Sequence, residues 1–161
     1  MSLQELANQL QMSKNTVATY LDLLSKVFII FEVEGFRRNL RKEIVKSSRS
    51  YFYDNGIRNV IINNFYRLDS RTDVGDLWKN YLALERVKKQ NYLKIKNNNY
   101  FWRDYDHQEL YWLEEKGEEL AGFKFKCSET KKVKIPAAFA KAYPDATFEV
   151  INKRNYLDFI T

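Results

Sequence analysis

Hydrophobic residues recur at helical spacing in two successive runs near the start of the chain. The first run has Leu3, Leu6, Ala7 and Leu10, and the second has Val17, Tyr20, Leu21 and Leu24. Steps of three and four residues place such side chains on one face of a helix, so the pattern predicts two amphipathic helices. We expect Ala7 to lie where the helices cross, and Val17 and Tyr20 to face the core.

Residues suited to helix ends flank both runs. Ser2 with Glu5 has the spacing of a capping box, and Ser13 is a candidate N-cap for the second helix. Gln11 lies in the turn between the helices, where many helix-turn-helix motifs have glycine. The two runs therefore predict a helix-turn-helix with an atypical turn.

Two strand-like segments, rich in β-branched and aromatic residues, follow at 28–34 and 50–54, joined by a loop at 35–49. Helix, turn, helix, strand, loop, strand is the order of a winged helix that lacks its first helix. We therefore expect a truncated winged-helix domain over residues 1–67 and a longer parent protein. A turn at 54–56 predicts a further helix that continues through Phe65.

The last two thirds of the chain alternate between helical and strand patterns after a polar stretch at 68–75, which predicts a linker. The pattern predicts helices at 76–89 and from Pro136 through Ala142, strands at 92–95, 100–103, 109–113, 120–127 and 146–151, and a short tail at 156–160. This order favours an α/β (α+β) domain over residues 76–161, with a mixed central sheet covered by helices.

Composition is that of a folded protein, with 45% hydrophobic and 30% charged residues. No apolar run approaches the roughly 18 to 20 residues that span a bilayer, and no signal segment is visible, so we expect a cytoplasmic protein without a membrane partner. The formal net charge is +6, and six basic residues gather between positions 37 and 49. They are Arg37, Arg38, Arg41, Lys42, Lys46 and Arg49.

Basic patches of this kind suit DNA phosphates, an acidic protein partner or simple solubility, and composition alone does not choose among them. If the second helix contacts DNA, Lys14 is its exposed cation, and Asn15 and Thr16 could read base edges. The phosphate contacts would then come from the loop residues Arg37, Arg38, Arg41 and Lys42. The alternative is a winged helix that packs on protein, and the sequence leaves both open.

Several short motifs recur in order along nearly the whole chain. They are Leu6-Ala7, Ser13-Lys14-Asn15-Thr16-Val17, Tyr20-Leu21, the segment 46–56, the segment 100–104, and Phe139 with Tyr143-Pro144. This ordered set resembles the C-terminal half of a large prokaryotic family of predicted AAA-type ATPases. The resemblance implies a P-loop module, then a winged helix, then a domain related to PD-(D/E)XK nucleases, which are restriction-endonuclease-like.

The residues that bind metal in such nucleases are largely replaced here. The family's helix motif Gly-x-x-Trp/Phe-Glu-Asn is matched by residues 75–80, where Lys79 stands in place of the glutamate, and Glu85 matches a second acidic position. The strand motif Glu-Val-Asp becomes Glu109-Leu110-Tyr111, and Glu-Val-Lys becomes Lys124-Phe125-Lys126. Because Mg²⁺ prefers carboxylate oxygens, these replacements predict a retired nuclease site without metal.

We therefore expect a non-catalytic segment that binds nucleic acid or an acidic protein and adjoins an ATPase module. ATP and Mg²⁺ would belong to that module alone, because the glycines at 35, 56, 75, 117 and 122 form no P-loop. The alternatives are a nuclease whose ligands have moved to Glu85, Asp104 and Glu109, or a purely structural oligomerisation region. The oligomeric state stays open.

Overall fold

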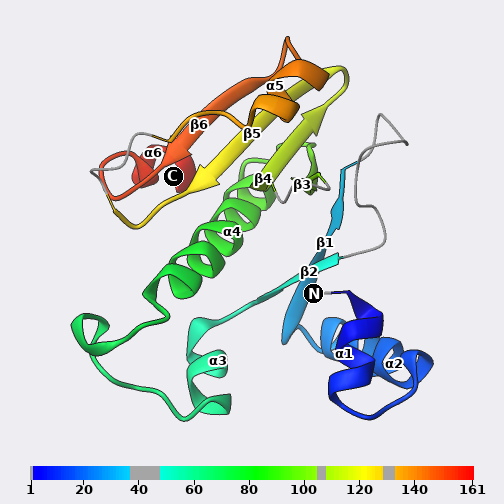
Figure 1. Cartoon of the computed structure of the whole chain (residues 1–161). Coiled ribbons are helices and arrows are strands. Elements are labelled where there is room, and N and C mark those ends of the chain that lie inside the picture. Colours follow the sequence, from blue (N-terminus) through cyan, green and yellow to red (C-terminus); the bar gives the residue numbers. More distant parts are fainter. Residues whose placement is uncertain (1, 37–47, 105–107, 129–132) are drawn as a thin grey trace.

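The computed structural model describes residues 2–36, 48–104, 108–128 and 133–161 (Figure 1). The helices are α1 (Leu3–Gln9), α2 (Lys14–Lys26), α3 (Asn55–Ile61), the 3₁₀ turn η1 (Leu68–Ser70), α4 (Val74–Tyr92), α5 (Ala137–Ala142) and α6 (Tyr156–Ile160). The strands are β1 (Ile30–Gly35), β2 (Ser48–Phe52), β3 (Asn98–Arg103), β4 (Glu109–Lys116), β5 (Glu119–Phe125) and β6 (Thr147–Ile151).

All six of these strands join one mixed sheet, in the order β2-β1-β3-β4-β5-β6. The β1–β3 and β5–β6 pairs are parallel and the others are antiparallel. The predicted α/β class is therefore confirmed. The sheet contains strands from both sides of the linker predicted at 68–75, because Glu34 and Gly35 of β1 pair with Tyr100 and Phe101 of β3.

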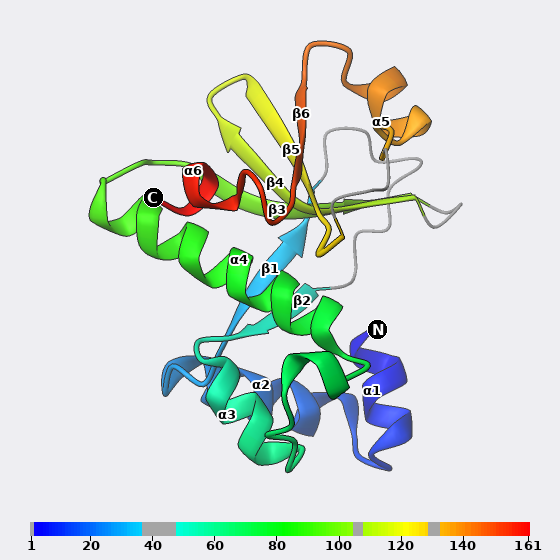
Figure 2. The same ribbon diagram turned by 90° about the vertical axis from the view of Figure 1, so that its left-hand side faces the viewer.

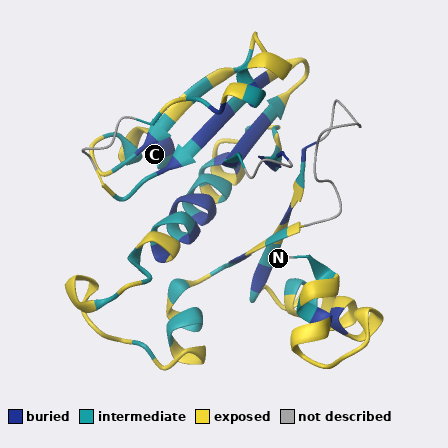
Figure 3. Ribbon diagram, in the orientation of Figure 1, coloured by how far each residue is buried: buried dark blue, intermediate teal, exposed yellow. Residues whose placement is uncertain are grey.

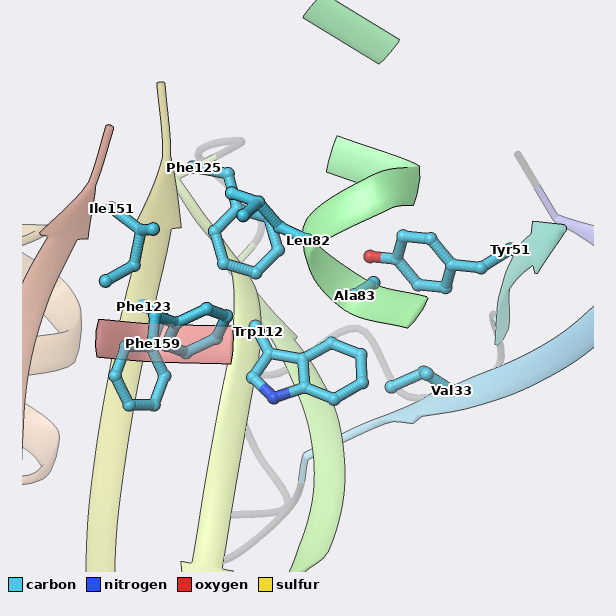
Figure 4. Close-up of a cluster of buried hydrophobic side chains, with 9 residues drawn as sticks. All are labelled: Val33, Tyr51, Leu82, Ala83, Trp112, Phe123, Phe125, Ile151 and Phe159. Carbon is cyan, nitrogen blue, oxygen red and sulfur yellow. The ribbon is translucent and has the colours of Figure 1, made fainter. Parts of the chain in front are cut away.

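Helices cover the two faces of the sheet, so the protein has two apolar layers (Figure 2). On one face, α4 and α6 pack on residues from β1, β2, β4, β5 and β6. The buried members of this cluster are Val33, Tyr51, Leu82, Ala83, Trp112, Phe123, Phe125, Ile151 and Phe159 (Figure 4). On the other face, α5 covers a second cluster, which contains Phe36, Trp102, Leu110, Leu113, Leu120, Phe139 and Tyr143.

The two N-terminal helices begin as the sequence predicts. Ser2 and Glu5 form the reciprocal capping box, and the Ser13 side chain accepts a hydrogen bond from the Thr16 backbone N–H. Ala7 and Val17 are buried. The expectation that Tyr20 faces the core is wrong, since this side chain is exposed. The apolar side chains of α2 extend over a wider arc of the helix than the described residues of the protein cover.

Helices α1 to α4 all end in the same hydrogen-bonded motif, although none has glycine at the position that requires a positive φ. The residues at that position are Gln11, Phe28, Asn63 and Lys94, with φ between 49° and 58°. After α4, for example, Ile95 N–H donates to the Gln90 carbonyl at 2.8 Å and Lys94 N–H to the Asn91 carbonyl at 3.3 Å. These two bonds define a Schellman motif, whose left-handed residue is usually glycine.

Two predicted elements are corrected by these helix ends. The strand predicted at 92–95 is wrong, because α4 continues through Tyr92 and Lys94 then turns the chain out of the helix. The helix predicted through Phe65 stops at Ile61, because Asn63 adopts the left-handed conformation that asparagine tolerates better than most residues. Asp54 caps the start of that helix, as expected for a turn residue.

Candidate functional site

A β-bulge in β4 shapes the candidate site. Tyr100 of β3 pairs with Leu113, but Trp102 pairs with Leu110, so β4 has one extra residue opposite Phe101. Leu110 and Leu113 therefore both face α5, while Tyr111 and Trp112 both pack on the α4 side. Bulges commonly re-aim a side chain in this way. Here the bulge directs Tyr111 towards the start of α4.

Arg49 of β2 lies against Tyr111 and forms the charged centre of the site. Its guanidinium carbon lies 4.6 Å from the Phe101 ring centroid and 5.0 Å from that of Tyr111, both within cation–π range. Its Nη2 lies 2.5 Å from Oε2 of Glu109, and both side chains are about three-quarters buried. Arg49 is therefore held between two aromatic rings and a carboxylate.

The ion pair fixes the charge state of Glu109. Burial raises the pKa of its carboxyl, but Arg49 and a hydrogen bond with Tyr111 outweigh burial, and the net pKa is lowered. Burial in turn raises the pKa of the Tyr111 hydroxyl. At neutral pH the pair is thus a carboxylate already matched by a guanidinium, beside a neutral phenol.

Lys79 approaches Tyr111 from α4. Its Nζ lies 4.7 Å from the Tyr111 ring centroid and 2.9 Å from Oδ1 of Asp76, one turn earlier in the helix. Burial lowers the pKa of this amine, but the hydrogen bonds to Asp76 and Tyr111 outweigh burial and leave the pKa raised. Two protonated cations, Arg49 and Lys79, therefore flank Tyr111.

This group opens into a cleft of about 960 Å³ between α1–α2 on one side and β1, β2 and α4 on the other. Leu3, Leu6 and Leu21 form part of its apolar wall. Its charged lining carries both signs. The cations are Arg49, Arg58 and Lys79, and the carboxylates are Glu32, Glu34, Asp76 and Glu115. The cleft is therefore mixed in charge rather than basic.

A partly buried ion network holds the α3 side of this cleft. The Asp73 carboxylate accepts hydrogen bonds from Arg58 at 2.6 Å and from Arg71 at 2.8 and 2.9 Å. Arg71 also donates to the Asn64 carbonyl and the Asn59 side chain, which ties α3 to the start of α4. The two guanidinium groups, Arg71 first, hold the pKa of Asp73 well below its usual range.

The structure brings together three of the six residues that the nuclease comparison singled out, namely Lys79, Glu109 and Tyr111. Lys124 follows Phe123 and precedes Phe125, both on the α4 face, so it points to the opposite face. Burial and the neighbouring Lys126 lower the pKa of the Lys124 amine. Glu85 lies further along α4, where it pairs with Lys88 at 2.7 Å.

The DNA-contact candidates divide in a different way. Lys14, Asn15 and Thr16 are exposed in the first turn of α2, where the Thr16 N–H is already bound by Ser13. The loop residues Arg37, Arg38, Arg41 and Lys42 lie outside the described residues.

Sequence reasoning missed Arg49 as a site residue and treated it as one of several basic loop residues. Its position in the strand could have identified it, because Arg49 lies two residues before the buried Tyr51 and so shares its face of β2.

Asn80 was also missed. Its side-chain amide accepts from Phe52 N–H at 2.7 Å and donates to the Phe52 carbonyl at 2.9 Å, which secures the end of the edge strand β2.

The described residues offer no cluster suited to a metal ion and no helix suited to a membrane. Within residues 2–36, 48–104, 108–128 and 133–161, no three His, Cys, Asp or Glu side chains gather closely enough to hold a metal ion. That includes Glu85, Asp104 and Glu109. Over the same ranges, the helices are too short or too polar to cross a bilayer.

Family models match two parts of the chain. A domain of unknown function, DUF8612, matches residues 1–67, and a second one, DUF4143, matches residues 74–157. Comparison with curated proteins and with solved structures gives no match. The second region contains β3 to β6 and the helix that carries Lys79, so the site lies where the two matched regions meet.

Proposed function

The chain belongs to the DUF4143 family, and from that membership we propose that it is the non-catalytic C-terminal region of an AAA-type ATPase, where it binds a protein partner. Domains of this family often lie at the C-terminal end of AAA-type ATPases. The proposal rests on the group formed by Arg49, Lys79, Glu109 and Tyr111. In this group, cations and a phenol lie where a nuclease needs metal-binding carboxylates.

Electrostatics argue against a divalent metal at this place. A doubly charged ion in the place of the Tyr111 ring would lie about 4.7 Å from the Lys79 amine, which is the distance between that amine and the ring centroid. At an effective dielectric of about 20, that repulsion amounts to about 7 kcal/mol. Glu109 cannot offset it, because its charge is already paired with Arg49. The arrangement therefore favours binding over phosphodiester cleavage.

The lining of the cleft favours a protein partner over nucleic acid. A polyanion in the cleft would meet Glu32, Glu34 and Glu115 as well as the cations. Apolar walls combined with charges of both signs are typical of protein interfaces, in which charges set the register. A partner segment with a carboxylate for Lys79 and a cation for Glu34 would suit this lining. A nucleic-acid partner would have to rely on the basic residues at 37–42.

Metal binding and cleavage test the non-catalytic part of the proposal. We expect no heat of Mn²⁺ or Mg²⁺ binding in calorimetry and no cleavage of single- or double-stranded DNA or RNA. The double substitution Lys79→Glu with Tyr111→Asp replaces a cation and a phenol with carboxylates, and should create measurable Mn²⁺ binding. Metal-dependent cleavage by the unmodified chain that Glu109→Gln abolishes, and Glu85→Gln leaves intact, would refute the proposal.

DNA binding tests the choice of partner. We expect only weak DNA binding. It should not depend on the DNA sequence, and its affinity should fall steeply as the salt concentration rises. If DNA is the true partner, Arg37→Ala with Arg38→Ala should weaken binding and flatten its salt dependence by about one unit per lost phosphate contact. The matched control is Lys116→Ala with Lys141→Ala, which removes two exposed lysines elsewhere. Tight binding that only the first pair weakens would replace the protein partner with DNA.

A further inference from the structure

The outer face of α2 carries an exposed apolar stripe that the proposed function does not use. Tyr20, Leu23, Leu24 and Val27 follow one another at steps of three, one and three residues, which places them on one side of the helix. Their exposed fractions are 55%, 50%, 39% and 62%, and Phe28 adds 69% at the helix end. Figure 3 shows how much of α2 is exposed, in contrast to the buried side of α4.

We propose that this stripe is the interface of a symmetric dimer, in which α2 packs antiparallel on α2 of a second copy. The stripe is symmetric about the midpoint between Leu23 and Leu24. An antiparallel pairing about a two-fold axis at that midpoint sets Tyr20 opposite the second copy's Val27, and Leu23 opposite its Leu24. A two-fold interface requires this self-complementarity, because the same patch serves both partners.

The size of the patch supports a weak pairing. Tyr20 and Phe28 alone leave roughly 190–310 Å² uncovered, because an aromatic side chain carries roughly 150–250 Å² of surface, and the two leucines and the valine add to this area. A pairing that covers this patch on both copies falls among the weak, transient interfaces, which bury less than about 1,200 Å² in total. Exposed patches of this size on a monomer commonly mark an interaction site.

Charge does not oppose the pairing where the helices would meet. The net charge of +6 on each copy would disfavour association if lysines or arginines faced each other across the axis. The polar residues next to the stripe, Thr16 and Thr19, are uncharged. Asp22 and Lys26 lie further round the helix, where they form their own ion pair at 2.6 Å. The contact can therefore form without opposing like charges.

Sedimentation equilibrium of the whole chain between about 1 and 100 µM tests the dimer. We expect a monomer–dimer equilibrium, which Leu23→Glu shifts to monomer because it places a charge at the axis. The matched control is Ile61→Glu, which changes an exposed apolar residue on α3 and should leave the dimer intact. A chain that stays monomeric at 100 µM overturns the proposal, and so does a dimer that Leu23→Glu leaves intact.

Crosslinking tests the geometry without disturbing the stripe's charge. In a Cys127→Ser background, Leu24→Cys lies beside the two-fold axis and should join two copies through a short bis-maleimide, while Leu10→Cys should not. Far-UV circular dichroism checks that each variant is folded. If Leu23→Glu fails to fold, Val27→Lys takes its place. Equal crosslinking at both positions would overturn the antiparallel α2 pairing.

Discussion

The buried carboxylate Glu114 offers the sharpest test of what holds the α4 face of the sheet together. It accepts four hydrogen bonds, from Arg86 Nε at 2.6 Å, Arg86 Nη2 at 2.8 Å, Trp112 Nε1 at 2.9 Å and Asn97 Nδ2 at 2.8 Å. Arg86 also donates to the Phe159 carbonyl, so one ion pair joins α4, β4 and α6. Glu114→Gln keeps the shape, removes the charge and turns an amide N–H₂ towards a cluster of donors.

The expected loss can be worked from these contacts. Removing one partner of a buried ion pair costs about 3–5 kcal/mol, because the remaining charge stays buried without compensation. Arg86 keeps its bond to the Phe159 carbonyl and its place 4.7 Å from the Phe159 ring, so we expect the lower end, about 3 kcal/mol. At a urea m-value of about 2 kcal/mol/M, the unfolding midpoint should fall by about 1.5 M.

Urea unfolding monitored by tryptophan fluorescence and circular dichroism measures this loss. The control Glu119→Gln changes an exposed glutamate of β5 and should stay within about 0.5 kcal/mol of the original chain. The double change Arg86→Met with Glu114→Leu should cost less than Glu114→Gln alone, because it leaves no unpaired charge. A loss below about 1 kcal/mol for Glu114→Gln, or a double variant less stable than the single one, would refute the reasoning.

Three further changes test local features of the structure. Lys94→Gly should raise the free energy of unfolding by about 1 kcal/mol, because glycine adopts the positive φ at the end of α4 without strain; an unchanged urea midpoint would contradict this. Asn80→Ala should lower it by about 2 kcal/mol, because the Phe52 N–H and carbonyl lose their partner, and Asn80→Asp should restore only the N–H bond. Asp73, whose pKa is lowered by Arg71, should stabilise the fold above about pH 4, near its unfolded pKa, and progressively less below it; the melting temperature of Asp73→Asn should therefore fall less between pH 5 and pH 3 than that of the original chain.

The positions of most helices and strands could be predicted from the sequence, because period and capping residues are local signals. The two capping serines and the strands around the polar turn at 117 are examples. The ends of α3 and α4 could not be predicted, because Asn63 and Lys94 occupy positions where glycine would have marked the stop. The exposure of Tyr20 was missed for a different reason, since periodicity shows an apolar face but not what covers it.

The site was predictable in part. The comparison with nucleases selected Lys79, Glu109 and Tyr111, and the structure brings them together. The comparison could not show that Lys124 lies on the opposite face of the sheet from Tyr111. A one-residue bulge in β4 changes the face on which Tyr111 lies, whereas β5, which carries Lys124, is regular. Arg49 was hidden because its partner Glu109 lies 60 residues away, a distance over which sequence spacing says nothing about contact.

The parallel pairing of β1 with β3 has a consequence for how the chain folds. Parallel strands need a long connection, and here that connection contains β2, α3 and the whole of α4. The contacts that surround it, from Arg49 to Glu109 and from Tyr51 to Tyr111, also close over 60 residues. Closing such long loops costs entropy before the contacts can compensate for it, so these long-range pairings should make the chain fold more slowly than a chain of the same length whose contacts are local.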